Sequence, residues 1–454
     1  MTYEVSYSQL ESRIDAEFYQ PEYITVMDEL RKYPNLENLG ALCKTIKSFG
    51  AYSLCNLVHY EQSGIHFIRV ENLKANEIDL TDVKYISKIT HRILHKSKVT
   101  EAMVLLSMAG TLGIAATVPS GFMECNSNQD IAKLVISERI DPYYLSTFLN
   151  CKYGRNQVLR LATGSTRRHI LLYAVSDIII PVPSMEKQKS VAAKIILANK
   201  MQDQARRLYS QTERQFYDIL SVDSSKFQSK EVFETVSSDV FDAMRFDAEY
   251  HRPSLQRYVL KALKETGFSL KKLAELAEFP RRLTDPRKDP HKKIRYVELA
   301  NVDPSTGEIR GVSEIAGHEA PSRAKLVLKK GDILVPSLLG SLDNVSLVPD
   351  ELDGAIGSSG FFVVRSKTLQ EGFLFMLFRS RLMKEQLEQK VAGSIMAAAS
   401  SKDLENLLVP VPSDEQQREI SCQITEYFRL RREATHLLEI SNHTVEDWIE
   451  SRQV

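Results

Sequence analysis

The sequence is poor in the residues that cross-link chains or bind transition metals, with only five cysteines in 454 residues. They are odd in number and no two form a Cys-x-x-Cys pair, which argues against a disulfide framework or a zinc knuckle. His91 and His95 are four residues apart, but no carboxylate or thiol is placed to complete a metal site. We therefore expect both histidines at the surface and no metal. The cysteines are Cys43, Cys55, Cys125, Cys151 and Cys422.

Long apolar runs are missing too, so no segment approaches the ~20 residues of a membrane-spanning helix. The first residues, MTYEVSYSQLESRIDAEF, are too acidic and too interrupted for a signal peptide, and the cytoplasm is the expected location. An excess of one charge is absent, with 59 Lys and Arg against 59 Asp and Glu. This argues against a free-standing, strongly basic nucleic-acid binder, but leaves a basic face or a basic partner open.

A duplicated motif organises the chain: Pro181-Val182-Pro183 returns as Pro410-Val411-Pro412, at an offset of 229 residues (410 − 181). In each copy an apolar, strand-like run leads into the prolines, which exclude a helix there. Ser184 and Ser413 then fit the N-cap of a following helix. Glutamates in the first turn and two further glutamines match at the same offset: Glu186, Glu415, Gln188 and Gln417.

The two predicted helices carry apolar residues at steps of three and four, as in a coiled-coil seam. Residues 184–220 carry a net charge of +3 (seven basic, four acidic) and residues 413–450 a net charge of −5 (four basic, nine acidic). Opposite charge favours pairing of the two helices within one chain. Two separate amphipathic surface helices are the alternative, and the repeat favours the pair. The expected interface residues are Gln188, Val191, Ile195, Tyr209, Phe216, Gln417, Ile420, Ile424, Tyr427, Leu438 and Trp448.

The regions before these helices also repeat, beginning with residues 13–23 and 245–255. Each copy predicts strands, then a polar turn leading to a strand (within 125–136 and 356–365), and then a helical segment that ends at a Gly-Ser, at 164–165 and 393–394. We expect an α+β fold with two tandem, pseudo-repeated domains, each followed by a long helix. The predicted boundaries are a first domain at 1–183, a spacer helix at 184–222, a second domain at 223–412 and a second spacer helix at 413–454.

Catalytic motifs are weak. Asp141-Pro142-Tyr143-Tyr144 is close to the Asp-Pro-Pro-Tyr signature of adenine methyltransferases, but it lacks the second proline and a glycine-rich cofactor loop. An Asp followed by Pro also starts many helices, and we predict a helix there. Residues 110–113 are too short for a phosphate-binding loop, and no nucleophile and base are arranged together. We therefore predict that the chain is not an enzyme.

Two such domains, each closed by Pro-x-Pro and a helix carrying Glu-x-Gln, resemble the specificity subunit of type I restriction-modification systems. The resemblance rests on IIIPVPSMEKQ at 178–188, LVPVPSDEQQREI at 408–420 and the Gly-Ser loops at 164–166 and 393–395. It implies that each domain is a target-recognition domain reading half of a split DNA site. It also implies that the helices form an antiparallel coiled coil that docks two adenine-N6 methyltransferase subunits.

Candidate DNA contacts are basic residues and asparagines in the irregular parts of both copies, because Arg and Lys suit phosphate or guanine and Asn suits adenine. They are Arg69, Asn72, Arg167, Arg168, His169, Arg281, Arg282, Lys292, Lys293 and Asn301. A solvated charge run is the alternative for the basic residues, and termination of a strand is the alternative for both asparagines.

The predicted function is that of a non-catalytic, DNA-recognition subunit. Its expected partners are double-stranded DNA with a split site, two methyltransferase subunits and, where present, a restriction nuclease subunit. We expect no cofactor on this chain and S-adenosylmethionine on the methyltransferases. A fused adenine methyltransferase and a protein scaffold without a DNA role are the alternatives; bound S-adenosylmethionine would indicate the first, and failure to bind any duplex the second.

Overall fold

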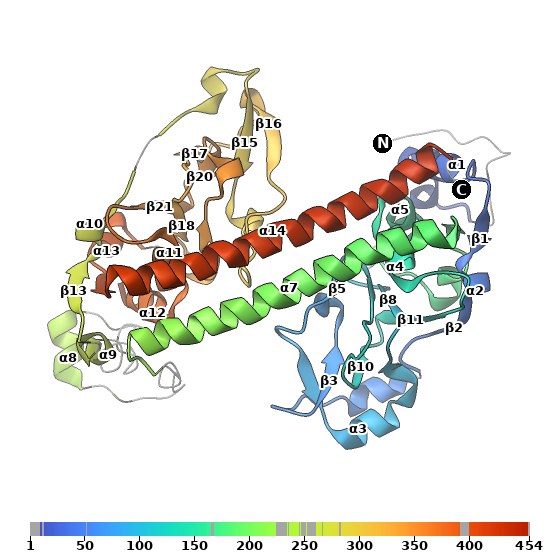
Figure 1. Ribbon diagram of the computed structural model, residues 1–454, viewed down its shortest axis with the longest axis horizontal. Helices are drawn as coiled ribbons and strands as arrows, with labels where there is room; N and C mark the ends of the chain where they lie inside the picture. The colour runs from blue at the N-terminus through green and yellow to red at the C-terminus, as the bar shows by residue number, and fades with distance from the viewer. Residues whose placement is uncertain are drawn as a thin grey trace. The chain divides into compact units, whose positions relative to one another are not determined.

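The structure is a computed structural model that describes residues 10, 13–50, 52–164, 168–223, 234, 236–244, 246, 251, 260–265, 267–280, 283–390 and 399–452. The chain divides into two compact units. Unit 1 comprises residues 1–203 and 431–454, and unit 2 comprises residues 204–430. Both units mix helices and strands, and each is described by itself below (Figure 1).

Unit 1 contains two four-stranded sheets. The helix-backed sheet has the strand order β2 (Cys43–Lys47), β11 (Ile131–Ile136), β8 (Val104–Ser107) and β9 (Ala115–Thr117), all antiparallel. The mixed sheet has the order β6 (Lys84–Ile86), β3 (Ile65–Ile68), β10 (Cys125–Ser127) and β7 (Lys98–Val99). Its central strands β3 and β10 are parallel. Two-stranded sheets are β1 (Leu36–Asn38) with β12 (Ile179–Pro181), and β4 (Leu73–Lys74) with β5 (Glu77–Ile78).

The helices that begin in unit 1 are α1 (Pro21–Leu30), α2 (Leu39–Leu42), α3 (Lys88–Ile93), α4 (Pro142–Asn150), α5 (Lys152–Leu161), α6 (Leu172–Val175) and α7 (Met185–Ile219). Short 3-10 helices are η2 (Ala16–Tyr19), η3 (Tyr52–Leu57), η4 (Val70–Asn72) and η5 (His95–Ser97). The side chain of Asp141 accepts the backbone N–H groups of Tyr143 at 2.8 Å and Tyr144 at 3.2 Å, so the predicted helix start at Asp141-Pro142 is confirmed.

Unit 2 repeats this arrangement. Its helix-backed sheet has the order β14 (Ala277–Glu278), β21 (Phe361–Ser366), β18 (Ile333–Pro336) and β19 (Ser346–Leu347). Its mixed sheet has the order β16 (Ser313–Ala316), β15 (Lys293–Val297), β20 (Ile356–Ser358) and β17 (Ala324–Val327), with β15 and β20 parallel. The two-stranded sheet pairs β13 (Ser269–Lys272) with β22 (Leu408–Val411).

The helices that begin in unit 2 are α8 (Ser237–Ala243), α9 (Leu260–Glu265), α10 (Leu273–Leu276), α11 (Glu371–Arg379), α12 (Arg381–Lys390), α13 (Ser401–Glu405) and α14 (Asp414–Glu450). Its 3-10 turns are η8 (Pro286–Lys288), η9 (Leu299–Asn301), η10 (Gly317–Glu319), η11 (Leu339–Ser341) and η12 (Asp350–Leu352). In the part of the chain that the structure describes, none of the helices combines the length and apolar character needed to cross a membrane.

Both long helices are shared between the units, since α7 passes from unit 1 to unit 2 after Asp203 and α14 passes from unit 2 to unit 1 after Leu430. Each unit therefore holds the start of one helix and the end of the other. In unit 1 the core gathers side chains from α4, from the start of α7 and from the end of α14, and burying each such side chain stabilises the fold by about 1.5–3 kcal/mol. Those from the long helices include Val191, Ile195, Val445 and Ile449.

Two expectations were wrong and one was incomplete. The polar segments turn at residues 129–130 and 359–360, directly before β11 and β21, as predicted, but their first residues, Cys125–Ser127 and Ile356–Ser358, form the buried central strands β10 and β20, which were missed. Small polar residues suit these positions because Asn126, which is fully buried, satisfies its amide internally, donating to Leu94 O at 2.9 Å. The single helical segment predicted before each Gly-Ser is two helices, broken at Cys151 and at Ser380, where the backbone is extended.

The third correction concerns His91, which we expected at the surface. It is only 5% exposed, because its ring packs inward from α3 and its Nδ1 hydrogen-bonds the side chain of Asn126. His95 is exposed as predicted. Among the residues that the structure describes, no cluster of three or more His, Cys, Asp or Glu could hold a metal ion.

Candidate nucleic-acid interface and helix anchors

A basic hollow opens in unit 2 beside the mixed sheet. Its volume is about 720 Å³, and it includes Lys292, one of the predicted DNA contacts. The loop that forms it is held by two backbone hydrogen bonds, from Thr284 N–H to Lys325 O at 2.8 Å and from Gly317 N–H to Lys292 O at 2.9 Å. The hollow is lined by Leu283, Thr284, Asp285, Pro286, Arg287, Lys288, Asp289, Lys292, Ile294, Lys325 and Ile356.

A glycine is required at the back of this loop. A Cβ atom on Gly317 would lie 2.2 Å from the carbonyl oxygen of Asp289 and 2.4 Å from that of Pro286. No real Cβ approaches backbone so closely, so any larger residue would push the segment that carries Arg287 and Lys288 away from the sheet. The close packing at Gly317 fixes the position of the basic loop.

The electrostatics of the basic hollow favour an anion. Arg287 pairs with Asp285 at 2.9 Å, and this hydrogen bond lowers the pKa of the Asp285 carboxyl. Lys288, Lys292 and Lys325 are exposed, and none of them forms a salt bridge with another residue that the structure describes. Three lysines without an internal partner give the hollow a positive charge that phosphate oxygens could neutralise.

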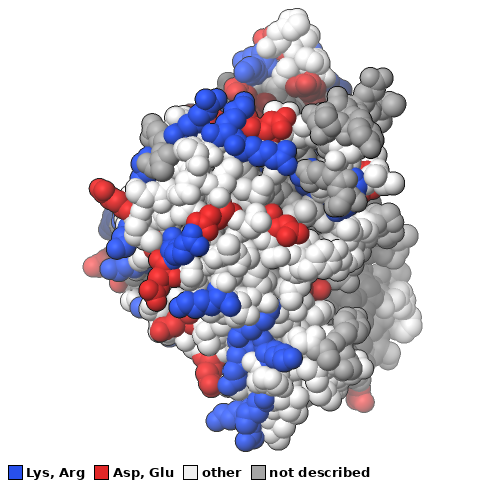
Figure 2. All heavy atoms as spheres, turned by 90° about the vertical axis from the view of Figure 1, so that its right-hand side faces the viewer, with Lys and Arg blue, Asp and Glu red and all other residues white. Residues whose placement is uncertain are grey.

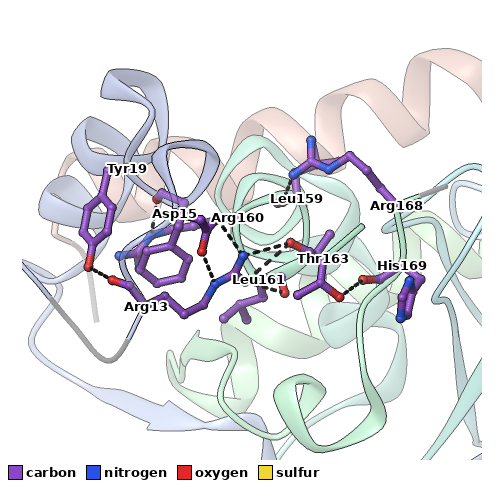
Figure 3. A network of polar contacts seen from close by, with 11 residues as sticks. Arg13, Asp15, Tyr19, Leu159, Arg160, Leu161, Thr163, Arg168 and His169 are labelled. Carbon is purple, nitrogen blue, oxygen red and sulfur yellow. Dashed lines mark hydrogen bonds and ion pairs between the residues drawn. The ribbon is translucent and has the colours of Figure 1, made fainter. Parts of the chain in front are cut away.

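The other predicted basic residues have mixed placements. Lys293 is exposed and faces Glu314 at 3.8 Å across the β15–β16 pair. Arg167, Arg281 and Arg282 lie outside the described residues. Arg168 is half-buried and donates from Nη2 to the carbonyl oxygen of Leu159, near the end of α5, where a cation is favoured (Figure 3).

His169 follows in the same loop and is exposed. Its backbone exchanges two hydrogen bonds with Thr163, the N–H of Thr163 donating to His169 O at 2.7 Å and the N–H of His169 donating to Thr163 O at 2.9 Å. Together with the hydrogen bond from Arg168 to α5, this pairing ties the described end of the predicted basic loop to unit 1 (Figure 3).

Thr163 also lines a second pocket, the arginine pocket, of about 360 Å³. Arg13 and Arg160 both approach the ring of Phe18 there, their guanidinium carbons lying 4.9 Å and 3.7 Å from its centre. Arg13 also pairs with Asp15 at 2.8 Å and donates to Leu161 O at 3.1 Å (Figure 3). Because these guanidinium groups already have partners, the pocket is a packed joint between the N-terminal segment and α5. Neither arginine was predicted as a site residue.

The remaining candidates in the two η turns have structural partners. Arg69 forms ion pairs with Glu71 at 2.5 Å and with Asp82 at 3.2 Å. Asn72 accepts the N–H of Arg69 at 2.9 Å and donates to Asp79 O at 3.0 Å.

Asn301 occupies the matching place in unit 2. It accepts the N–H of Glu298 at 2.8 Å and donates to Gly311 O at 2.9 Å. The side-chain amide groups of Asn72 and Asn301 therefore hold equivalent turns, and the geometry favours the alternative that these asparagines terminate strands.

One basic surface was missed by the sequence reasoning. Helix α3 presents Lys88 and Arg92 to solvent, four residues apart, and Lys96 is exposed in the following turn η5. The four-residue spacing of the cations in KITHRILHK, residues 88–96, could have indicated a basic helix face. That interpretation requires His91 to face inward, which the structure shows and the sequence does not.

Each long helix is joined to the unit in which it begins by a buried glutamine. The side-chain oxygen of Gln188 accepts the N–H of Asp141 at 2.8 Å, and its amide nitrogen donates to Pro183 O at 2.9 Å. Gln417 accepts the N–H of Gln370 at 3.2 Å and donates to Pro412 O at 2.9 Å. We call Gln188 and Gln417 the glutamine anchors. They are 1% and 2% exposed, so each one satisfies backbone groups that water does not reach.

The end of the other long helix is held at the break between the two short helices. In unit 1 the N–H of Lys152 donates to the carboxylate of Glu446 at 2.8 Å. In unit 2 the N–H of Arg381 donates to the hydroxyl of Tyr217 at 3.0 Å. Both pairs obey the same offset, 381 − 152 = 229 and 446 − 217 = 229. The helix breaks at Cys151 and Ser380 thus free an N–H group to bind a long helix.

Side chains of α7 and α14 meet in each unit with antiparallel numbering. Lys187 lies 5.5 Å from the ring centre of Trp448 in unit 1. In unit 2 the rings of Tyr209 and Tyr427 are 5.2 Å apart, and Gln423 donates to Gln215 at 2.8 Å. Among the other predicted interface residues, Leu438 is half-buried and the following are buried: Val191, Ile195, Phe216, Ile420 and Ile424.

The chain is similar to proteins named as type I restriction specificity subunits. The family model described as "Type I restriction modification DNA specificity domain" matches residues 265–440. The chain is 22% identical over 309 residues to the type I restriction enzyme EcoBI specificity subunit of Escherichia coli, covering 66% of this chain and 62% of the relative. It is 24% identical over 143 residues to the StySPI specificity subunit of Salmonella potsdam, covering 31% of this chain and 30% of that relative.

The solved structures that resemble the chain include the S subunit of a type I restriction-modification system from M. genitalium. The identity is 12%, the TM-score is 0.46, and the alignment covers 92% of this chain and 96% of that one. The alignments with the two curated relatives span less than two thirds of either relative's length. The resemblance predicted from the two Pro-Val-Pro motifs is confirmed, since the family model and both curated relatives carry the names of type I specificity proteins.

Proposed function

We propose that the chain is the DNA-recognition subunit of a type I restriction-modification complex. Each unit reads one half of a split target in double-stranded DNA, and the chain itself carries no catalytic centre. It acts in the cytoplasm beside two adenine-N6 methyltransferase subunits, which bind S-adenosylmethionine, and a restriction nuclease subunit joins through them where one is present.

The duplication of the recognition unit is the observation that carries this proposal. The family match covers residues 265–440, within unit 2 and the following part of α14, and unit 1 has the same two sheets, with the same strand orders and the same parallel central pair. The register of the parallel central strands agrees as well, since Phe67 of β3 pairs with Asn126 of β10 in unit 1 and Tyr296 of β15 pairs with Ile356 of β20 in unit 2. Two copies of one recognition fold suit a target with two halves.

The two long helices serve as the spacer between the target-recognition domains and pair as an antiparallel coiled coil. Support comes from the contacts within each unit, Lys187 with Trp448, Tyr209 with Tyr427 and Gln215 with Gln423, which follow a single antiparallel register. A helix of 35 residues, the length of α7, spans about 50 Å at 1.5 Å per residue, longer than the ~34 Å of one DNA turn. The half-sites should therefore be separated by a fixed spacer.

DNA contact in unit 2 is assigned to the basic hollow, with Lys292 as a predicted residue and Lys288 and Lys325 as additions. Lysines without internal partners supply a positive field and bind phosphate, while the bases are read by neighbouring side chains. Arg281 and Arg282 precede this loop directly in the sequence, and they remain predicted contacts.

The test is methylome sequencing of cells with and without the gene, since methylation is read at every site at once. We expect loss of methylation at one split motif, with adenine as the modified base, when the gene is deleted. An unchanged methylome, in cells that retain active methyltransferase subunits, would contradict the proposal. Complementation with a chain carrying Lys288→Ala, Lys292→Ala and Lys325→Ala should restore methylation only weakly if the basic hollow binds DNA.

A further inference from the structure

Helix α3 in unit 1 is a short helix held rigidly from one side. Ser87 caps it by accepting the N–H of Thr90 at 3.0 Å. Leu94, at its end, is fully buried, and Asn126 of β10 donates to Leu94 O at 2.9 Å and to Ser97 Oγ at 2.6 Å. With the inward bond from His91 to Asn126, these contacts fix α3 and η5 on the mixed sheet and determine which side chains face outward.

The outward side, the α3 face, combines cations with apolar side chains: Lys88, Ile89, Arg92, Ile93 and Lys96. Ile89 and Ile93 are 64% and 44% exposed. The three cations are exposed, and none of them forms a salt bridge with another described residue. The carboxylate of Glu124 lies 3.5 Å from the inward-facing ring of His91. In Figure 2, Lys and Arg side chains gather at the lower end of the face, the level at which Figure 1 draws α3.

This composition selects the kind of ligand. Cations one helical turn apart suit the closely spaced phosphates of a nucleic-acid strand. Two exposed isoleucines between them would gain nothing from phosphate, but apolar side chains contact base edges such as the thymine methyl group in a groove. Unit 2 has no helix at the matching place, where η10 follows β16, so the α3 face belongs to unit 1 alone.

We propose that the α3 face contacts duplex DNA over the half-site that unit 1 reads, with Lys88, Arg92 and Lys96 on phosphates and Ile89 and Ile93 against the groove. This inference rests on the proposed function and extends it, because it gives a DNA contact to a helix for which the sequence motifs predicted none.

The experiment compares the full chain, assembled with its methyltransferase subunits, with the variant Lys88→Ala, Arg92→Ala, Lys96→Ala. Binding to a duplex that carries the split motif identified by methylome sequencing is measured by fluorescence anisotropy at several salt concentrations. We expect at least a tenfold loss of affinity at low salt, and a salt slope shallower by about 0.9 per lost phosphate contact. The variant Ile89→Ser, Ile93→Ser should lose affinity while keeping the wild-type slope.

A matched control removes three exposed lysines elsewhere in unit 1, Lys32, Lys44 and Lys74, and should leave affinity and slope close to the wild type. Circular dichroism checks that all variants fold. If the triple cation variant matches this control while the wild type binds its motif tightly, the α3 face does not touch DNA and the inference is overturned. If the wild-type complex binds no duplex at all, the proposed function has failed, and the inference falls with it.

Discussion

The side chain of Gln188 binds the first residue before α4, its oxygen accepting the N–H of Asp141 at 2.8 Å. The same group donates to Pro183 O, so one buried amide joins the Pro-Val-Pro segment, the start of α7 and the N-cap of α4. The Glu-x-Gln motif therefore has a physical reason in this chain. Its glutamine fixes the angle at which the long helix leaves the unit.

Replacing Gln188 by Ala should leave Asp141 N–H and Pro183 O without partners in a site that water does not reach. The expected cost is about 1–3 kcal/mol of unfolding free energy, measured by urea denaturation. Gln417→Ala should behave alike in unit 2. Gln211→Ala, on an exposed position of α7, is the control. Equal stability of Gln188→Ala and this control would show that the anchor bonds contribute nothing.

Lys133 gives a pH-dependent prediction. It is fully buried on β11, where its ammonium donates to Ser127 Oγ at 2.7 Å and Ile131 O at 3.3 Å, and burial lowers its pKa to about 7. Between that value and 10.5 the unfolded chain binds the extra proton, so the stability of the protein should rise with pH. Below about 7 the lysine is charged in both states, and the destabilisation is at its full size.

Lys133→Met should therefore stabilise the protein most at or below pH 7, and its advantage should shrink as pH approaches 10.5, by up to about 1.4 kcal/mol per pH unit. Methionine suits the site because the matching residue of unit 2, Val363, is apolar and pairs with Leu334 as Lys133 pairs with Leu105. Urea denaturation at pH 6, 8 and 9.5 measures the difference, with Lys44→Met as the exposed control. A pH-independent difference would mean that Lys133 does not titrate in this range.

Exchange of one unit's reading segment tests whether the units act separately. Replacing residues 245–405 with the matching segment of a relative should change one half of the methylated motif, because unit 2 has its own sheets and its own basic hollow. Methylome sequencing reports both halves together. A change in both halves would refute independent reading.

Lengthening α7 tests its role as a spacer. Four residues inserted after Ala205, which is fully buried, add about one helical turn and keep the apolar seam nearly in phase. The helix grows by ~6 Å, which corresponds to about two base pairs. We expect a lengthened spacer between two unchanged half-sites. Methylation that persists at the original spacing would rule out the helices as the ruler.

Much of the fold could be predicted from the sequence because its signals are local. The Pro-Val-Pro segments, the N-caps Ser184 and Ser413 and the apolar stripe each depend on neighbours within one or two turns. Strands β10 and β20 were missed because a short polar segment predicts a turn when its parallel partner strand, which is distant in the sequence, is not known.

The site was less predictable for the same reason. Whether His91 points inward depends on Asn126, 35 residues later, and whether Asn72 or Asn301 is free to meet a base depends on carbonyl groups beyond the turn. The charge of a residue does not show whether it is available to DNA: Lys292 lines a hollow, whereas Arg69 forms ion pairs with two carboxylates.

The contacts at the two helix breaks differ in chemistry although they agree in position. Lys152 meets the carboxylates of Glu446 and Glu450, and Arg381 meets the phenol of Tyr217. In an assembly of two copies of the first half, Tyr217 would take the place of Glu446 beside Lys152, and the negative charges that Lys152 contacts would be lost. Each helix end therefore fits one break better than the other. This difference favours a chain that joins one first half to one second half over an assembly of two copies of the same half.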